Sequence, residues 1–207
     1  MPNIDFKNLE RALGEITWPD CDSRRSVLPD GVTSVQAFAM GLVQSRTTQH
    51  PICSRFLRDW PHLVQLATSF INRHADPQFR YTTMQFNKDY AASLHTDRNN
   101  EGPSYIAGFG DYTGGELWIY HPQGDVRVKV ERRIDGASWA KVGSTIPGRL
   151  IDIRKRLVPF DGKQPHMVFP FHGHRTTVVW FTSRLWRRTR AEDMVRLKAC
   201  LFRLPVE

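Results

Sequence analysis

The sequence predicts a mainly β protein with flanking helices, in which short antiparallel strands close as a barrel or jelly roll. From residue 81 onward, short apolar segments alternate with Gly, Pro and Asn, which is typical of strands joined by tight turns. No helical pattern lies between these segments, so the strands cannot be joined by parallel helical crossovers. Helical spacing of apolar residues occurs on both sides of this region. The 207 residues, 40% of them apolar, suit one domain with a real core, or one domain with a helical extension.

The flanking helices are predicted from their apolar stripes. Residues 5–15 place Phe6, Leu9 and Leu13 on one face, and residues 20–33 have the composition of a loop. Residues 52–71 form a longer amphipathic pattern in which Pro61 splits the helix or begins its second piece. A last helix is expected at 189–203.

Seven segments are expected to be strands. The stretch 111–118, DYTGGELW, is interpreted as a tight turn between two of them. Residues 121–149 are long and charged, and are predicted to hold a hairpin and to act as a flap over a site. The organisation is thus an N-terminal helical region at 1–80, a β core at 81–184 and a basic C-terminal helix at 185–207. The predicted strands are 81–87, 104–111, 116–120, 126–130, 156–160, 166–169 and 176–182.

Charge is distributed unevenly along the chain. The net charge is +8, yet residues 127–207 hold 18 Lys and Arg against 7 Asp and Glu, whereas residues 1–126 hold 11 against 14. A basic half favours a polyanionic partner such as nucleic acid, although a solvated cationic face has the same composition. The sequence shows no apolar run long enough for a membrane helix and no secretory signal, and its three cysteines are far apart. These features predict an intracellular protein, in cytoplasm or nucleus, that is not secreted.

The chemistry is carried first by the stretch SLHTDRNN at residues 93–100. In an extended segment, His95 and Asp97 point to the same face. Such a pair is a surface ion pair, a catalytic pair or two ligands of a metal ion.

A second cluster, at residues 161–182, supplies the partners for a metal site. His166 begins a short strand after a turn, and Arg175 begins an apolar strand nine residues later, with FHGH between them as a turn. Two antiparallel strands joined in this way would bring His166 and Arg175 together. Two imidazoles and one carboxylate can occupy one face of a ferrous ion and leave three positions open for a 2-oxo acid and dioxygen. An arginine, helped by the hydroxyl of Thr177, can then bind the far carboxylate of that acid.

Residues 81–183 resemble the double-stranded β-helix (cupin-like) core of the iron(II)/2-oxoglutarate-dependent dioxygenases, since His95, Asp97, His166 and Arg175 match its four chemical positions. The resemblance implies that the first three residues bind Fe(II) and are catalytic, and that Arg175 binds 2-oxoglutarate. It also implies O2 as a substrate and ascorbate as a possible stimulant. The expected activity is hydroxylation of a C–H bond.

Two branches of this superfamily are similar to the sequence. Residues 95–118, with asparagines after H-x-D, resemble the TET/JBP-type enzymes, which oxidise methyl groups on nucleic-acid bases. The segments GGELWIY and PHMVFPFHGHRTTVVWF also resemble prolyl hydroxylases, which act on protein. We favour a nucleic-acid substrate, DNA or RNA, because of the basic half and because residues 184–203 could follow a phosphate backbone. Alternatives are a peptidyl hydroxylase and a metal-binding cupin-like barrel that oxidises nothing.

Further site residues follow from strand parity and from turns. Tyr81 and Asn87 share the polar face of the first predicted strand, and are expected to help hold 2-oxoglutarate or else to face water. Asn99 and Asn100 are expected either to stabilise the turn after Asp97 or to contact substrate. His172 and His174 are interpreted as turn residues rather than ligands. Core packing is expected for the aromatic residues Trp118, Phe160 and Trp180.

Overall fold

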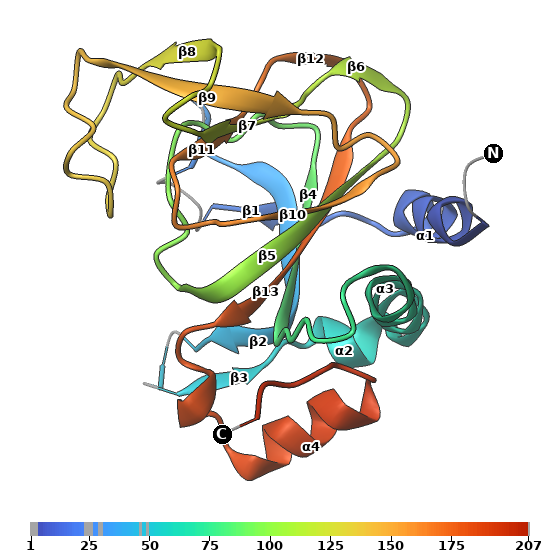
Figure 1. Cartoon of the computed structure of the whole chain (residues 1–207). Coiled ribbons are helices and arrows are strands. Elements are labelled where there is room, and N and C mark those ends of the chain that lie inside the picture. Colours follow the sequence, from blue (N-terminus) through green and yellow to red (C-terminus); the bar gives the residue numbers. More distant parts are fainter. Residues whose placement is uncertain (1–3, 23–26, 29–30, 46, 49, 207) are drawn as a thin grey trace.

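The structure is a computed structural model that describes residues 4–22, 27–28, 31–45, 47–48 and 50–206. Two antiparallel sheets face each other, and helices cover the outer side of the larger one (Figure 1). This architecture confirms the predicted fold class. The helices are α1 (Ile4–Glu15), α2 (Phe56–Asp59), α3 (Pro61–His74) and α4 (Ala191–Ala199), with a 3-10 turn at Trp186–Arg188.

The major sheet has seven strands, six of which lie in the order β1-β2-β4-β13-β5-β10, while β3 pairs with β2 outside this order. Its pairings are all antiparallel, and the long strands β2, β4, β13 and β5 form the centre. The strands are β1 (Asp20–Cys21), β2 (Val35–Gln44), β3 (Pro51–Cys53), β4 (Thr83–Lys88), β5 (Asn100–Phe109), β10 (Leu157–Phe160) and β13 (Thr176–Ser183).

The minor sheet has the order β11-β7-β9-β8, and β6 and β12 form a separate two-stranded pair. The hairpin of β8 and β9 confirms the one predicted within 121–149. The strands of the minor sheet are β7 (Leu117–Tyr120), β8 (Val126–Lys129), β9 (Thr145–Ile151) and β11 (His166–Val168). The separate two-stranded pair consists of β6 (Tyr112–Gly114) and β12 (Phe171–Gly173).

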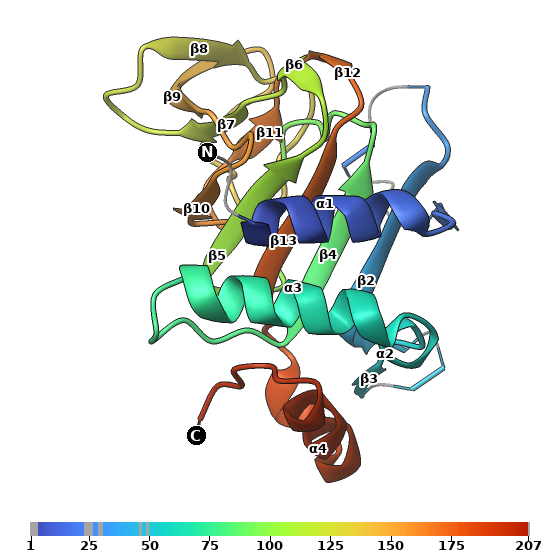
Figure 2. The ribbon, with the colours of Figure 1, turned by 90° about the vertical axis from the view of Figure 1, so that its right-hand side faces the viewer.

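The main core lies between the major sheet and its helices. Helices α1 and α3 cross the outer face of β5, β13, β4 and β2 (Figure 2). Phe70 of α3 stacks on Trp180 of β13 at 5.7 Å between ring centroids and meets Phe6 of α1 edge-on at 4.7 Å. Because helices seal this face, the opposite face of the major sheet is the one left to form a cavity with the minor sheet.

Most predicted elements are confirmed, with boundaries shifted by a few residues. Pro61 occupies the first turn of α3, as expected. Trp118, Phe160 and Trp180 are buried, as expected. The seven predicted strands correspond to β4, β5, β7, β8, β10, β11 and β13.

The region 1–80 differs from the predicted helical region, because β2 is a ten-residue strand at the centre of the major sheet. It pairs with β4 from Gln36–Lys88 to Gly41–Thr83. The two segments interpreted as turns, 111–118 and 171–174, also contain the paired strands β6 and β12. No helix in the described part of the chain is long and apolar enough to cross a membrane.

Candidate metal centre

The two candidate histidine ligands are direct partners across an isolated antiparallel bridge. The backbone N–H of His95 donates to the carbonyl of His166 at 3.0 Å, and the N–H of His166 donates to the carbonyl of His95 at 2.9 Å. Residues 95 and 166 are far apart in the sequence. These two hydrogen bonds therefore fix their separation independently of any bound ion.

The side chains of His95, Asp97 and His166 converge, with ligand atoms that all lie within 4.8 Å of one another. The Nε2 atom of His95 is 3.6 Å from Asp97 Oδ1, and that of His166 is 3.7 Å from Asp97 Oδ2. This is the geometric condition that the sequence interpretation required. The three donors can occupy one face of a divalent ion such as Fe(II).

Both imidazoles are held in the orientation that a metal ligand requires. His95 Nδ1 lies 2.6 Å from the Ser93 carbonyl, and His166 Nδ1 lies 2.8 Å from the Gln164 carbonyl. A carbonyl can only accept, so each Nδ1 donates a proton, and Nε2 is the ring nitrogen that faces Asp97 and is available as a ligand atom. The orientation of the two rings therefore fits a cation bound through both Nε2 atoms.

The carboxylate of Asp97 is oriented by its own turn. Its backbone N–H donates to the Gly162 carbonyl at 2.7 Å, and its Oδ2 accepts a hydrogen bond from Asn100 Nδ2 at 3.1 Å. A Cβ at Gly162 would lie 3.0 Å from Asp97 Oδ2 and 3.1 Å from Asp97 Cβ, so a side chain there would displace the carboxylate slightly. Asn100 is buried, so its amide can hold the Asp97 carboxylate in one orientation.

The candidate ligands form one wall of a cavity of about 110 Å³ between the two sheets, which we call the inner cavity. Arg175 lines the same cavity and is only 2% exposed. Its Nε and Nη2 atoms have no hydrogen-bond partner among the described residues. Burial lowers the pKa of the Arg175 guanidinium, but arginine stays charged in proteins. A buried cation with unsatisfied donors calls for an anion.

Arg175 is held in place by aromatic rings and by its backbone. The guanidinium carbon lies 5.6 Å from the ring centre of Tyr112 and 5.5 Å from that of Phe171. The Arg175 N–H donates to Asp89 Oδ1 at 2.8 Å. A Cβ at Gly115, where φ is +71°, would lie 2.8 Å from Arg175 Nε, so the absence of a side chain there lets the guanidinium pass.

A chain of polar groups continues the cavity wall beside Arg175. Asn87 Nδ2 donates to Thr177 Oγ1 at 3.2 Å, and the Tyr90 hydroxyl donates to Asn87 Oδ1 at 3.0 Å. All three line the inner cavity. Asn87 and Thr177 thus lie where the sequence predicted, whereas Tyr90 escaped prediction because it follows the strand.

Tyr81 does not reach the inner cavity, which corrects its predicted role. Strand β4 begins at Thr83, so the alternation of faces does not extend back to residue 81. The Tyr81 ring is fully buried against Phe79 and Phe202, and its hydroxyl donates to Asn72 Oδ1 at 3.3 Å. The tyrosine of the cavity is Tyr90.

The route by which His166 and Arg175 meet also differs from the predicted hairpin. His166 lies on β11 in the minor sheet, and Arg175 lies just before β13 in the major sheet. Strand β12 carries the chain from one sheet to the other. Its residue His172 is exposed, and His174 contacts Asp89 at 3.3 Å, so neither lies with the candidate ligands.

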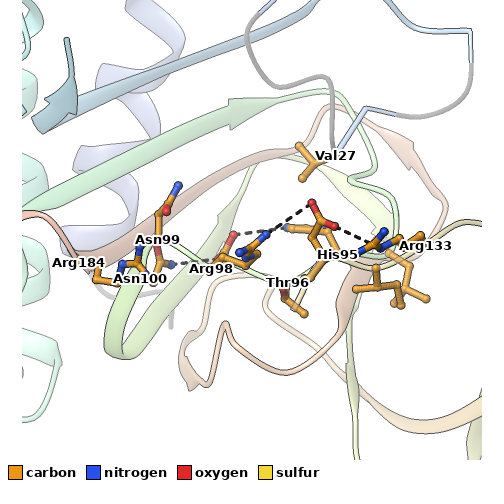
Figure 3. A pocket seen from close by; sticks show the side chains of 12 residues that line it. Val27, His95, Thr96, Arg98, Asn99, Asn100, Arg133 and Arg184 are labelled. Atoms are coloured by element: carbon orange, nitrogen blue, oxygen red, sulfur yellow. Dashed lines mark hydrogen bonds and ion pairs between the residues drawn. The ribbon is translucent and has the colours of Figure 1, made fainter. Parts of the chain in front are cut away.

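A second, more open pocket of about 450 Å³ lies on the outer side of the candidate ligands, and we call it the outer pocket. It shares His95, Asp97 and Asn100 with the inner cavity. Figure 3 shows Asn99, Asn100 and Arg98 between Arg184 and Arg133 along this pocket. Asn99 is exposed there, whereas Asn100 points to Asp97.

The chain is similar in fold to a solved oxygenase structure. An oxidoreductase of the 2OG-Fe(II) oxygenase family from Burkholderia pseudomallei is similar at 15% identity, with a TM-score of 0.53, over 86% of this chain and 78% of that one. The fold is therefore the double-stranded β-helix of the 2OG-Fe(II) oxygenases. No family model and no curated protein sequence matches the chain.

Two further solved structures are similar at lower scores. NgTET1 in complex with 5mC DNA has 12% identity and a TM-score of 0.44, over 79% of this chain and 69% of that one. A prolyl hydroxylase in complex with a hypoxia inducible factor peptide fragment, from Trichoplax adhaerens, has 13% identity and a TM-score of 0.41, over 86% and 76%. At these scores neither structure bears on the substrate of this chain.

Proposed function

We propose that the chain is an Fe(II)/2-oxoglutarate-dependent dioxygenase that hydroxylates a C–H bond. The observation that carries this proposal is the buried guanidinium of Arg175 in the same cavity as the His95, Asp97 and His166 donors. A barrel that only bound a metal ion would have no use for a buried cation beside the site. An anionic co-substrate that also reached the metal would satisfy both groups.

In this proposal each residue has a defined task. His95, Asp97 and His166 hold Fe(II), with Asn100 orienting the carboxylate. Arg175 and Thr177 bind the far carboxylate of 2-oxoglutarate, with Asn87 and Tyr90 holding the Thr177 hydroxyl in place. Iron with O2 would supply the oxidation, in which one oxygen atom enters the substrate C–H bond and the other enters succinate as 2-oxoglutarate loses CO2.

For the substrate we infer a nucleic-acid base, with its methyl group as the favoured position. The support is the excess of basic residues in 127–207 and the resemblance of residues 95–118 to the TET/JBP-type enzymes. A peptidyl hydroxylase is the alternative. Incubation of the protein with Fe(II), ascorbate, 2-oxoglutarate and either DNA, RNA or peptides, followed by mass spectrometry, distinguishes the two substrates.

The oxygenase itself is tested without knowledge of the substrate. Anaerobic addition of 2-oxoglutarate to the Fe(II) protein should produce a metal-to-ligand charge-transfer absorption, and admission of O2 should then yield succinate. His166→Ala, which removes one donor, serves as the control and should give neither signal. If the wild-type protein gives neither signal, the metal-binding barrel without oxidation replaces this proposal.

A further inference from the structure

Three arginines from distant parts of the sequence line the outer pocket. Arg98 follows the Asp97 ligand position, Arg133 belongs to the loop between β8 and β9, and Arg184 follows β13. In the view of Figure 3 they lie in a row, with Arg184 and Arg133 at the two ends. We call these residues the arginine row. No described residue pairs with the Arg184 side chain.

One acidic residue of the same pocket, Asp135, neutralises one end of the arginine row. Its Oδ2 lies 3.8 Å from Arg98 Nη1, and its Oδ1 lies 3.8 Å from Arg133 Nε. The three side chains are 64–86% exposed, so these ion pairs are weak and exchange readily with another anion. The Asp135 carboxylate thus lies where an incoming anion would be bound by both guanidinium groups.

The loop that carries Arg133 and Asp135, residues 130–144, is anchored by a small core of its own. Ile134, Ala137 and Ala140 are buried against Trp118. The Thr96 hydroxyl donates to the Asp135 carbonyl, and a Cβ at Gly136 would lie 2.8 Å from Thr96 Oγ1. The loop is therefore packed against the segment of the candidate metal ligands, so the backbone that carries Arg133 and Asp135 is in place before a ligand binds, while their exposed side chains can still adjust.

We propose that the arginine row binds the phosphodiester backbone of a single nucleic-acid strand, and that the Asp135 carboxylate is an internal counter-ion which a phosphate displaces. This inference rests on the proposed function and specifies how its substrate is held. Asp97 also lines the outer pocket, but in the proposed function its carboxylate is taken up by the metal ion. The three arginines and the displaceable Asp135 carboxylate then match a chain that carries one negative charge per repeat. An ordinary peptide backbone has no such charges.

Equilibrium binding to a fluorescein-labelled oligothymidylate of about 12 nucleotides tests the row. Arg184→Gln should weaken binding about fivefold and reduce the slope of log affinity against log salt by about 0.7. Asp135→Asn should tighten binding about threefold, because the phosphate no longer competes with a carboxylate. A peptide nucleic acid of the same sequence, which lacks phosphates, should bind weakly and should not respond to either substitution.

Arg58→Gln and Asp59→Asn are matched controls, because Arg58 and Asp59 form an exposed ion pair on α2, outside both pockets. Both variants should bind the oligonucleotide like the wild type. An unchanged affinity and slope in Arg184→Gln would overturn the inference, as would an Asp135→Asn variant that binds no more tightly. Tighter binding of a polyglutamate peptide than of the oligonucleotide would do so as well. Succinate formation by the wild-type protein is measured separately. If succinate forms but the binding results fail, the inference about the arginine row is wrong while the proposed oxygenase stands; if no succinate forms, the proposed function itself fails.

Discussion

The inner cavity and the outer pocket share two candidate ligands, His95 and Asp97, but present their positive charge in opposite ways. In the inner cavity a single guanidinium, that of Arg175, is 2% exposed and fixed between rings. In the outer pocket the charges of Arg98 and Arg133 are largely exposed and share one weak counter-ion. A buried cation selects one small anion of fitting shape, whereas exposed cations add up to a graded, salt-dependent attraction. The first arrangement suits a constant co-substrate and the second a large substrate.

The largest effect is expected at the junction of the two regions. Asp97→Ala removes a donor that the inner cavity and the outer pocket share, so Fe(II) binding and succinate formation should fall to background. Circular dichroism should show an intact fold, because the bridge between residues 95 and 166 does not involve the Asp97 side chain. Measurable turnover in Asp97→Ala would show that the reaction does not depend on the proposed metal centre.

The next largest effect should be confined to the inner cavity. Arg175→Met should raise the 2-oxoglutarate concentration required for half-maximal succinate formation at least about 30-fold, since a buried charged hydrogen-bond pair is lost. It should also raise the free energy of unfolding of the ligand-free protein by about 1 kcal/mol, because a buried cation with unsatisfied donors is removed. Titration with 2-oxoglutarate and urea denaturation measure the two effects.

Arg154→Met is the control for that variant. Arg154 also approaches Tyr112, donating to its carbonyl at 2.9 Å, but it is exposed and lies outside the inner cavity. Its replacement should leave the 2-oxoglutarate requirement at the wild-type value. An equal rise in both variants would mean that Tyr112, rather than the buried charge, is responsible.

A smaller effect should distinguish two neighbouring asparagines. Asn100→Ala removes the hydrogen bond to Asp97 Oδ2 and should weaken Fe(II) affinity about tenfold. Asn99→Ala changes an exposed residue of the outer pocket and should leave Fe(II) affinity unchanged. Competition with a metal-sensitive dye measures both. Equal Fe(II) affinities in the two variants would show that the Asn100 side chain does not stabilise the metal centre.

The smallest effect tests how rigidly Arg175 is held. Gly115→Ala places a Cβ 2.8 Å from Arg175 Nε at a residue with φ of +71°. Gly143→Ala imposes similar backbone strain at φ +85°, but a Cβ there meets nothing within 4 Å. Both should lower the free energy of unfolding by about 1 kcal/mol. Only Gly115→Ala should also weaken 2-oxoglutarate binding, by a few fold, and equal binding in both would show that Arg175 adjusts freely.

The sequence was most informative about the inner cavity, because local patterns define its residues. H-x-D in an extended segment and His166 with Arg175 before an apolar strand locate the donors and the buried cation. The alternation of side chains along a strand then predicted that Asn87 and Thr177 face the cavity. The same alternation failed for Tyr81, since that residue lies outside β4 and packs against Phe79 and Phe202, and it could not find Tyr90. Strand β2 was missed because small apolar residues alternate there with large apolar ones, so the apolar–polar alternation of a half-buried strand is absent.

The outer pocket could not be predicted, because its walls come from segments that only the fold brings together. Arg98, Arg133 and Arg184 belong to three different loops, and no spacing in the sequence relates them. The basic C-terminal helix illustrates the difficulty. The Arg184 end of residues 184–203 does reach the outer pocket, but α4 packs beside β3, where Asp193 accepts hydrogen bonds from Cys53. Net charge alone did not reveal which basic residues face the site.

The bridge between His95 and His166 has a consequence for how the protein acquires its ion. Two reciprocal backbone hydrogen bonds and two carbonyl contacts set both rings before any cation arrives. Loading with iron is then a docking event rather than a coupled folding event, so a chelator should strip the ion and leave the polypeptide intact. In the proposed metal centre, the ion would thus be added to and removed from a polypeptide that is already folded.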